Sequence, residues 1–511
     1  MRYAVTAQQM RDLEQQAFAE GVPSLLLMER AAACVVDAVE DILGSLIGRR
    51  VLFVCGPGNN GGDGLAAARM VYARGGHPIV WLSAAPHTQD ARSNLSFLQA
   101  LQVPVQVIEA GEELPDIYFD AVVDALFGIG LSRAPEGVAA SLIAYINARR
   151  APVISIDVPS GADASTGRVY VPCVSARTTV VCHCHKLGLL TGSARAYTGD
   201  LRVVDIGLPQ ALVERFAARD NWPCVAESKD LPALLPKRSA VAHKGSNGRV
   251  LILAGSFGMA GAAALAARTC LTAGAGLVTL AAPACIIPTL QQLVPNATCI
   301  PVEQAVTAPP AHDVLLAGCG LSVSAQAWEQ FVALYDRNRP TVLDADGLNM
   351  LAQQDNFRLS SNTIITPHPG EAARLLHTDI DAVTADLPGA ARALHAQYNA
   401  MVLLKSHGSV IYDGKRMAIH AIAAPSLAKG GSGDMLAGIL AALMAQEKPA
   451  PDVFRCGQAA SLWMSMAANK AAQTLGDLSV LSGDVISCLG PVAAAYQHPP
   501  NGKQRHAPAG S

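Results

Sequence analysis

The sequence predicts an α/β protein with two domains, each built on a parallel β-sheet that has helices on both faces. In both halves of the chain, short apolar runs of strand type alternate with longer helical stretches, which is typical of parallel sheets. A glycine-rich turn joins such a strand to a helix in each half. The length of 511 residues also favours more than one domain.

The composition favours large buried cores and gives no sign of nucleic-acid or membrane partners. Hydrophobic residues form 51% of the chain and charged residues 15%, with a net charge of −3, so no basic surface is indicated. The longest uncharged stretch, residues 269–302, contains Pro283, Pro288 and Pro295 and is expected to be buried in a globular domain. Twelve scattered cysteines and an N-terminus unlike a signal peptide predict a cytoplasmic protein.

The first half opens with two expected helices, residues 6–20 and 25–43, and Ser24 is the expected N-cap of the second. A strand at residues 50–55 and a helix at residues 65–74 follow, joined by the turn GPGNNGGDG. A ligand-binding crossover has this same order of a strand, a glycine-rich turn and a helix. The segment is therefore a candidate binding site.

The turn GPGNNGGDG carries oxygen-bearing side chains on a permissive backbone. It has neither the GxGxxG nor the P-loop pattern, but it offers Asn59, Asn60 and Asp63 as polar contacts. A tight structural turn is the alternative interpretation, since Gly and Asn are common turn residues. The turn is richer in glycine than a simple connection requires, which favours ligand binding.

Two later strands of the first half end in an acid. Asp124 precedes FGIGLSR, and Asp157 precedes VPSG. Ligands bind beyond the carboxyl ends of strands in parallel sheets, so we expect both acids and the glycine-rich turn to share one edge. Ordinary strand-end residues are the alternative for each acid. The strands expected after the helix at residues 65–74 are residues 77–82, 103–108, 121–126 and 153–158.

The segment TVVCHCHK, residues 179–186, contains residue types that bind metals. In a strand, however, the side chains of Cys182, His183, Cys184 and His185 would alternate between two faces, so the four could not surround one tetrahedral ion. A sheet strand with two unusual histidines is therefore expected here.

Three motifs of the first half, VCGPGNNGGDG, VVDALFGIGL and SIDVPSG, together resemble the YjeF-type NAD(P)H-hydrate epimerase domain of bifunctional NAD(P)H-hydrate repair enzymes. The resemblance implies a Rossmann-like fold and a potassium ion held by Asn60, Asp124 and Ser160, whose oxygens suit such a cation. Ala32 replaces the glycine usual in the family, which affects helix packing and not the site. Asp157 is also implied as catalytic, and the residues implied to bind hydrated NADH or NADPH are Asn59, Asn60, Gly61, Gly62, Asp63, Gly128, Ile129, Gly130, Leu131, Ser132, Arg133, Ala134 and Asp157.

The stretch from Leu208 to Lys237 carries charges and prolines but no motif, which makes it the candidate join between domains. The predicted division is a first domain at residues 1–215, a linker at 216–235, a second domain at 236–490 and a disordered tail at 491–511.

In the second half, polar residues again follow expected strands. Asp344 and Asp346 lie in DADGLNML, His368 and Glu371 in TPHPGEAARLL, and residues 405–409 lie between two strands. A core or capping histidine is the alternative interpretation of His368.

The most informative loop is KGGSGDMLAG, residues 429–438, which leads into an apolar helix. Its glycines permit close approach of a ligand, and a helix N-terminus favours an anion such as phosphate. Asp434 would repel a phosphate, so it is interpreted as a base that takes a proton from a hydroxyl beside a phosphoryl group. An Asp N-cap after a glycine turn is the alternative.

Several motifs of the second half, HKGSNGRVLILAGS, DADGLNML, TPHPGEAARLL, LLKSHGSV and GGSGDMLAG, resemble the ribokinase-like, ADP-dependent NAD(P)H-hydrate dehydratase domain of the same family. Ser406 stands where the family most often has glycine, and Ser432 where members vary. The resemblance implies Asp434 as the catalytic base. It implies hydrate binding by Ala262, Gly320, His368 and Asp434, and binding of ADP or AMP by Lys405, Ser406, His407, Gly408, Ser409 and Gly433.

Together the resemblances imply a repair enzyme of nicotinamide nucleotides. The first domain would interconvert the R and S epimers of hydrated NADH and NADPH, and the second would dehydrate the S epimer using ADP, with Mg²⁺, releasing AMP and phosphate. A homo-oligomer is expected. The alternative function is an ATP-dependent kinase of a small hydroxylated metabolite, with a nucleotide-binding regulatory N-terminal domain.

Overall fold

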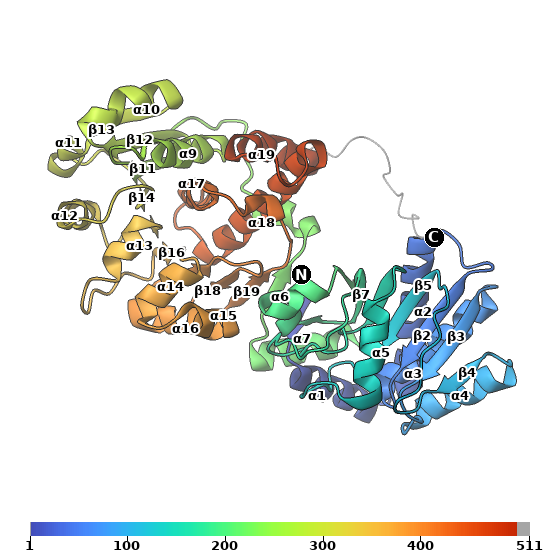
Figure 1. The fold of residues 1–511 in the computed structure, drawn as a ribbon. Helices are drawn as coiled ribbons and strands as arrows, with labels where there is room; N and C mark the ends of the chain where they lie inside the picture. Colours follow the sequence, from blue (N-terminus) through green and yellow to red (C-terminus); the bar gives the residue numbers. More distant parts are fainter. Residues whose placement is uncertain (1, 498–511) are drawn as a thin grey trace, which may run out of the picture. The chain divides into compact units, whose positions relative to one another are not determined.

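The computed structural model describes residues 2–497, which divide into two compact units (Figure 1). The first unit is Arg2–Cys224, and the second begins at Val225. The division falls within the join predicted at residues 216–235. Each unit contains a largely parallel sheet with helices on both faces, so the predicted fold class is confirmed.

The first unit is built on a sheet with the strand order β4-β3-β2-β5-β6-β7-β9, in which all neighbours run parallel. A further parallel pair joins β1 to β8. The strands are β1 (Arg2–Val5), β2 (Arg50–Cys55), β3 (His77–Leu82), β4 (Val105–Val107), β5 (Ala121–Ala125), β6 (Val153–Ile156), β7 (Thr178–Cys182), β8 (His185–Lys186) and β9 (Asp200–Val204). The helices are α1 (Ala7–Ala19), α2 (Ser24–Leu43), α3 (Asn59–Ala73), α4 (Gln89–Ala100), α5 (Gly137–Asn147), α6 (Leu187–Thr191), η1 (Ser193–Tyr197) and α7 (Gln210–Asp220).

Both faces of the first sheet are buried. On β2, Val51 and Phe53 belong to a core shared with α2, α3 and α4, whereas Leu52 and Val54 belong to a second core shared with α5. A strand that is covered on both faces needs an uninterrupted apolar sequence, which explains the run RVLFVC.

The second unit has the strand order β13-β12-β11-β14-β15-β16-β17-β18-β19. Neighbours run parallel as far as β17, and β18 and β19 are added antiparallel. The strands are β11 (Arg249–Leu253), β12 (Leu277–Ala282), β13 (Thr298–Pro301), β14 (Val314–Ala317), β15 (Thr341–Leu343), β16 (Thr363–Ile365), β17 (Met401–Leu404), β18 (Val410–Tyr412) and β19 (Met417–His420), with β10 (Cys224–Ala226) at the division. The helices are η2 (Ser228–Asp230), α8 (Leu231–Leu234), α9 (Ala260–Thr272), η3 (Ala284–Ile286), α10 (Ile287–Leu293), α11 (Val302–Thr307), α12 (Ala325–Leu334), α13 (Asp346–Leu351), α14 (Pro369–Leu376), α15 (Ile380–Ala385), α16 (Leu387–Tyr398), η4 (Pro425–Leu427), α17 (Ser432–Gln446), α18 (Val453–Leu475) and α19 (Ser482–Gln497).

Helix α17 lies at the centre of the second unit. Every residue from Met435 to Ala445 is buried, and the helix packs against α9, α18 and the strands β11, β14 and β15. The other face of the sheet is covered by helices α11 to α16, through a core that includes Leu253, Leu315 and Phe331. This packing fixes the N-terminus of α17, and therefore Asp434, at the edge of the sheet.

The join and the tail are more ordered than their composition indicates. The stretch predicted as a linker contains the end of α7, β10, η2 and α8, and buries Phe216 and Leu231. The tail predicted from residue 491 does not begin there, because α19 continues to Gln497. Burial of Val492 and Ala493 favours the helix despite Pro491, whose ring removes one helical hydrogen bond. The remainder of the predicted tail, residues 498–511, lies outside the described residues.

Two local expectations of the first unit were wrong. TVVCHCHK is not one strand, because His183 has a left-handed φ of 62° and separates β7 from β8. Ser24 does not cap α2. It is the first helical residue after Pro23, and its hydroxyl donates to Asp90 Oδ2 at 2.6 Å.

None of the helices in the described part of the chain combines the length and the apolar character that crossing a bilayer requires.

Candidate active sites

The first candidate site is a cavity of about 480 Å³ at the carboxyl edge of the first sheet. Its walls come from α1, α2, the start of α3 and the loops after β5 and β6. The lining stops at Leu131 in the loop after β5, and the predicted contacts Ser132, Arg133 and Ala134 follow in the same loop. The predicted residues that line the cavity are Asn59, Asn60, Asp63, Gly128, Ile129, Gly130, Leu131 and Asp157.

Residues 59–64 of the glycine-rich turn form the start of α3, which begins at Asn59 and not at residue 65 as predicted. A Cβ on Gly61 would lie 1.8 Å from the carbonyl oxygen of Gly56, and a Cβ on Gly62 would lie 2.5 Å from Cε of Met28. These glycines therefore let α3 pack closely and leave the cavity contacts to their neighbours.

Asp124, at the end of β5, is the hub of a buried hydrogen-bond network. Its carboxylate accepts hydrogen bonds from Ser155 Oγ at 2.8 Å, from the Ser160 N–H at 2.9 Å and from Ser160 Oγ at 2.6 Å. Burial raises the pKa of Asp124 above its ordinary value, and the hydrogen bonds oppose that rise. The structure thus brings Asp124 and Ser160 into direct contact, although they come from different strand ends.

Asn60 faces the loop after β5. A Cβ on Gly128 would lie 3.0 Å from Asn60 Oδ1. Asn60 Nδ2 is buried and has no hydrogen-bond partner among the described residues. Because buried amides are normally paired, this side chain is positioned for a group that the chain itself does not supply.

Asp157, directly after β6, is held by a buried lysine. Its Oδ1 lies 2.7 Å from Lys186 Nζ and accepts a hydrogen bond from the Cys182 N–H at 2.9 Å. Lys186 also donates to the carbonyl oxygens of Cys182 and Cys184. Asp157 has a left-handed φ of 64°, a conformation that is uncommon for a residue with a side chain.

The sequence did not single out Glu14, which lines the same cavity from α1. Burial and the charge of Asp157 raise the pKa of Glu14 to about 7. The pKa of Asp63 is raised well above its ordinary value by burial, and then by Asp157 and Glu14. The spacing of Arg11, Glu14 and Phe18 on one helix face is the signal that could have marked this face, but core-facing residues show the same spacing.

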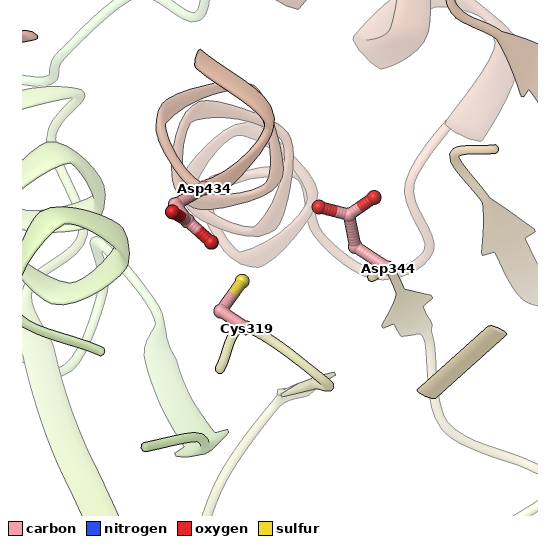
Figure 2. A group of neighbouring side chains, drawn as sticks. All are labelled: Cys319, Asp344 and Asp434. Atoms are coloured by element: carbon pink, nitrogen blue, oxygen red, sulfur yellow. The ribbon is translucent and has the colours of Figure 1, made fainter. Parts of the chain in front are cut away.

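The second candidate site lies where α17 meets the ends of β14 and β15. Figure 2 shows Asp434 on α17, Asp344 after β15 and Cys319 after β14. One side-chain atom of each of these three residues lies within 4.8 Å of the others. Asp434 is the third residue of α17, and the N-cap is Gly431, with a φ of 91°. The alternative interpretation of Asp434 as a helix cap is therefore wrong.

Asp434 is suited to accept a proton near neutral pH. Burial and the neighbouring charge of Asp344 raise its pKa to about 6, against the opposing effects of a hydrogen bond from Cys319 and the charge of Lys405. A base with a pKa slightly below the working pH is mostly ionised and still basic enough to take a proton.

Lys405 links several acids at this site. Its Nζ lies 2.7 Å from Asp344 Oδ1 and 3.8 Å from Glu371 Oε2, and Thr366 Oγ1 donates to Asp344 Oδ1 at 2.8 Å. Burial alone would lower the pKa of Lys405, but Asp344 and Glu371 raise it above its ordinary value. The ammonium group is therefore charged beside Asp344.

Gly433 leaves open space between the N-terminus of α17 and this ion pair. A Cβ at this position would lie 3.2 Å from Lys405 Nζ and 3.3 Å from Asp344 Oδ2. Free N–H groups of a helix start, a lysine and closely approachable backbone form a cradle for an anion.

The rest of the predicted nucleotide-binding segment, residues 405–409, forms a tight loop between β17 and β18. Ser409 Oγ accepts a hydrogen bond from the Ser406 N–H at 3.1 Å and donates to the Ser406 carbonyl oxygen at 2.9 Å. Ser406 Oγ lies 3.2 Å from His407 Nδ1. The loop is thus shaped by its own hydrogen bonds, and Gly408 lies between these residues.

His368 is the N-cap of α14, as its alternative interpretation proposed. Its Nδ1 accepts hydrogen bonds from the N–H groups of Gly370 and Glu371, and its Nε2 lies 3.6 Å from Glu371 Oε1. Burial and then Lys405 lower the pKa of His368. The side chain is 51% exposed, so capping leaves one edge of the ring accessible to a ligand.

The structure brings Ala262 and Gly320 together. A Cβ on Gly320 would lie 2.9 Å from the Cβ of Ala262, and Gly320 has a φ of 59°. Gly320 follows Cys319, which the sequence did not single out because a lone cysteine after a strand has no distinguishing pattern.

Models of two protein families match the chain, one in each unit. A YjeF-related protein N-terminus matches residues 24–188, and NAD(P)H-hydrate dehydratase matches residues 250–489. Curated relatives match nearly the full length. The bifunctional NAD(P)H-hydrate repair enzyme Nnr of Moorella thermoacetica is 36% identical over 95% of this chain and 96% of its own. The enzyme of the same name from Coxiella burnetii is 36% identical over 94% and 97%.

A solved structure resembles the second unit. The ADP/ATP-dependent NAD(P)H-hydrate dehydratase from Bacillus subtilis, co-crystallised with ATP and Mg²⁺, aligns with a TM-score of 0.50 and 25% identity, covering 54% of this chain and 99% of its own. Both units and nearly the whole length are thus accounted for: the chain belongs to the family of bifunctional NAD(P)H-hydrate repair enzymes.

Proposed function

We propose that the first unit interconverts the R and S epimers of hydrated NADH and NADPH, and that the second dehydrates the S epimer at the expense of ADP, giving AMP and phosphate. The observation that carries this proposal is that each unit contains its own site at the carboxyl edge of its own sheet, with acids from separate segments converging there.

The dehydration requires activation of a hydroxyl group. Hydration of the reduced nicotinamide leaves a hydroxyl on C6, and hydroxide is a poor leaving group. Asp434 takes the proton of this hydroxyl while the hydroxyl oxygen attacks the terminal phosphoryl group of ADP, and the bond from that group to AMP breaks, so that AMP leaves with the electron pair. The N–H groups at Gly431 to Gly433 and the ammonium of Lys405 stabilise the transferred group. Phosphate then leaves C6 with its electron pair, and loss of a C5 proton restores the ring double bond.

Substrate binding in the second unit is assigned to two groups of residues. Ala262, Gly320 and His368 hold the hydrate beside Asp434, which is supported by the position of Gly320 directly after Cys319, a neighbour of Asp434. The AMP part of the nucleotide lies along residues 405–409, next to Gly433.

Mg²⁺ is proposed to enter with the nucleotide. Asp344 offers the hard carboxylate oxygens that Mg²⁺ prefers, whereas the Cys319 thiol does not suit it. The ion would supply positive charge beside the phosphates. It would rely on this carboxylate only in part, since Lys405 already pairs with Asp344.

A potassium site is proposed at Asn60, Asp124 and Ser160. The buried carboxylate of Asp124 has no cationic partner among its hydrogen-bond donors, which are hydroxyl and N–H groups, and Asn60 Oδ1 faces the loop that follows Asp124. These features support a site for a monovalent cation with oxygen ligands. When bound, the ion would balance the charge of Asp124 next to the cavity.

The kinase alternative is not favoured, because the matched relatives are bifunctional NAD(P)H-hydrate repair enzymes and the match covers nearly their full length. One experiment distinguishes the candidates. Full-length protein is incubated with hydrated NADPH, ADP and Mg²⁺. Return of the absorbance of the reduced cofactor supports repair, accumulation of a stable phosphorylated product supports a kinase, and nucleotide binding without turnover supports a regulatory module.

The proposal includes a cytoplasmic homo-oligomer. All twelve cysteines are free thiols, which suits a reducing compartment. Analytical ultracentrifugation of the full chain tests the oligomeric state.

The second unit should retain dehydration of the S epimer when it is expressed alone from about residue 225. The reason is that this unit has its own sheet, core and site, and domains of this kind usually fold independently. Turnover of S-hydrate with ADP by the fragment is compared with that of the full chain. A folded but inactive fragment beside an active full chain would contradict the assignment of the site to one unit.

A further inference from the structure

Glu14 reaches the epimerase cavity from a different direction than the residues that the sequence marked. Arg11, Glu14 and Phe18 line the cavity from one face of α1, whereas Asp157 approaches from the end of β6 and Asp63 from the first turn of α3. Asp90, at the start of α4, lines it as well, so a ligand in this cavity meets carboxyl groups from four separate elements.

The carboxyl groups of Asp157 and Glu14 are held differently. Asp157 is fixed by an ion pair with Lys186, whose Nζ is 2.7 Å away, and by the N–H of Cys182. The side chain of Lys186 is fully buried, so its charge requires that of Asp157. Glu14 has a pKa of about 7, because burial and the charge of Asp157 raise it more than Lys186 and Arg11 lower it. Two carboxyl groups whose environments differ in this way suit one base and one acid.

His87 and Asp90 line the cavity from the start of α4 and the loop before it, and Asp90 accepts a hydrogen bond from Ser24. The buried titratable groups that are electrostatically coupled to Glu14 do not match it as a proton carrier. Burial raises the pKa of Cys182 and Cys184, so both thiols stay neutral at pH 7. Asp63 has a pKa raised well above its ordinary value, by burial and by Asp157 and Glu14, which favours a group that keeps its proton. A group that gives and takes back a proton is most efficient when its pKa is close to the working pH.

We propose that Glu14 is a catalytic residue of epimerisation and acts on the hydrated ring together with Asp157, one carboxyl group as acid and the other as base. The inference rests on the proposed epimerase function of the first unit.

The step follows from the chemistry of the C6 hydroxyl, which shares its carbon with the ring nitrogen N1. Asp157 takes the hydroxyl proton, the oxygen forms an aldehyde with C6, and the C6–N1 bond breaks. N1 keeps the electron pair of that bond and receives the proton of Glu14. After rotation of the aldehyde, N1 attacks its other face, Glu14 takes back the N1 proton, and Asp157 returns its proton to the oxygen.

Replacing Glu14 by Gln tests this role in the full-length protein with R-hydrate as substrate. We expect kcat for epimerisation to fall by about a hundredfold to ten-thousandfold, with KM changed only a few-fold, because Gln keeps the size of the side chain but donates no acidic proton. In the wild type, the rate should decline as pH rises through about 7, where Glu14 loses its proton. The epimerisation rate of Glu14→Gln should no longer decline above pH 7. Glu14→Asp should recover part of the rate and part of its pH dependence.

The matched control is Glu20→Gln, the same change on the exposed residue that follows α1; it should leave both activities unchanged. Dehydration of S-hydrate and the thermal unfolding profile show that each Glu14 variant is folded. A normal kcat in Glu14→Gln would overturn the inference, and so would a slow variant that keeps the decline above pH 7. Loss of the decline in Asp63→Asn instead would assign the role to Asp63. A wild-type chain that does not epimerise R-hydrate would overturn the proposed function itself.

Discussion

Replacing Asp434 by Asn should lower ADP-dependent dehydration of S-hydrate by at least about a hundredfold, the lower bound of the usual contribution of a general base. Asn has nearly the same shape but cannot accept the proton of the C6 hydroxyl. The structure removes a competing explanation, because Gly431 and not Asp434 caps α17. Loss of rate in this variant therefore cannot be attributed to a lost helix cap.

Nucleotide affinity separates the two ways in which Asp434→Asn could be inactive. ADP binding, measured by calorimetry, should persist or tighten, because a negative charge beside the phosphates has been removed. Epimerisation of R-hydrate by the same protein should be unchanged and serves as the internal control. Near-normal dehydration would show that Asp434 is not the base, whereas loss of both turnover and ADP binding would indicate a damaged anion loop.

Replacing Asp124 by Ala should abolish epimerisation and leave dehydration of S-hydrate unchanged. The carboxylate of Asp124 accepts hydrogen bonds from Ser155 and Ser160 and is the only charged member of the proposed potassium site. Its removal leaves buried donors without an acceptor, at about 1–3 kcal/mol for each unsatisfied group. The first unit should therefore lose stability as well as activity.

Asp124→Asn distinguishes loss of the ion from loss of the fold. Asn fills the same space and can still accept hydrogen bonds, but it has no charge to hold a cation. We expect this variant to be folded and to require much more K⁺ for epimerisation than the wild type, as measured by K⁺ titration of the rate. If a folded Asp124 variant lost both activities together, the assignment of separate sites to separate units would be wrong.

The elements best predicted from the sequence are those in which local pattern and tertiary environment agree. The bounds predicted for β2 and β3 from their apolar runs, residues 50–55 and 77–82, are the observed ones. The reason is that a strand buried on both faces must be continuously apolar. The short strand β1 was not predicted, since its four residues carry no such pattern. The start of α3 was placed too late, because glycine disfavours helix locally and only the packing against Gly56 and Met28 explains its use there.

The candidate sites were predicted as far as residues at strand ends could show them. Asp124 lies at the end of a strand and Asp157 and Asp344 directly follow strands, and the carboxyl edge of a parallel sheet gathers such residues. Glu14 and Cys319 were not identified, because a glutamate on an amphipathic helix and a single cysteine after a strand have many ordinary explanations. Their place beside Asp157 and Asp434 depends on how α1 and β14 pack, which no local pattern contains.

The ion pair between Asp157 and Lys186 has a consequence for how this site can vary. A glycine at position 157 would relieve a left-handed backbone that costs roughly 1 kcal/mol, yet it would leave the ammonium of Lys186 buried without a counter-ion, at about 3–5 kcal/mol. A neutral residue at position 186 would in turn leave the carboxylate of Asp157 without its partner. A substitution at either position alone is therefore destabilising. The two positions are 29 residues apart in the chain, and we expect them to be substituted together or not at all.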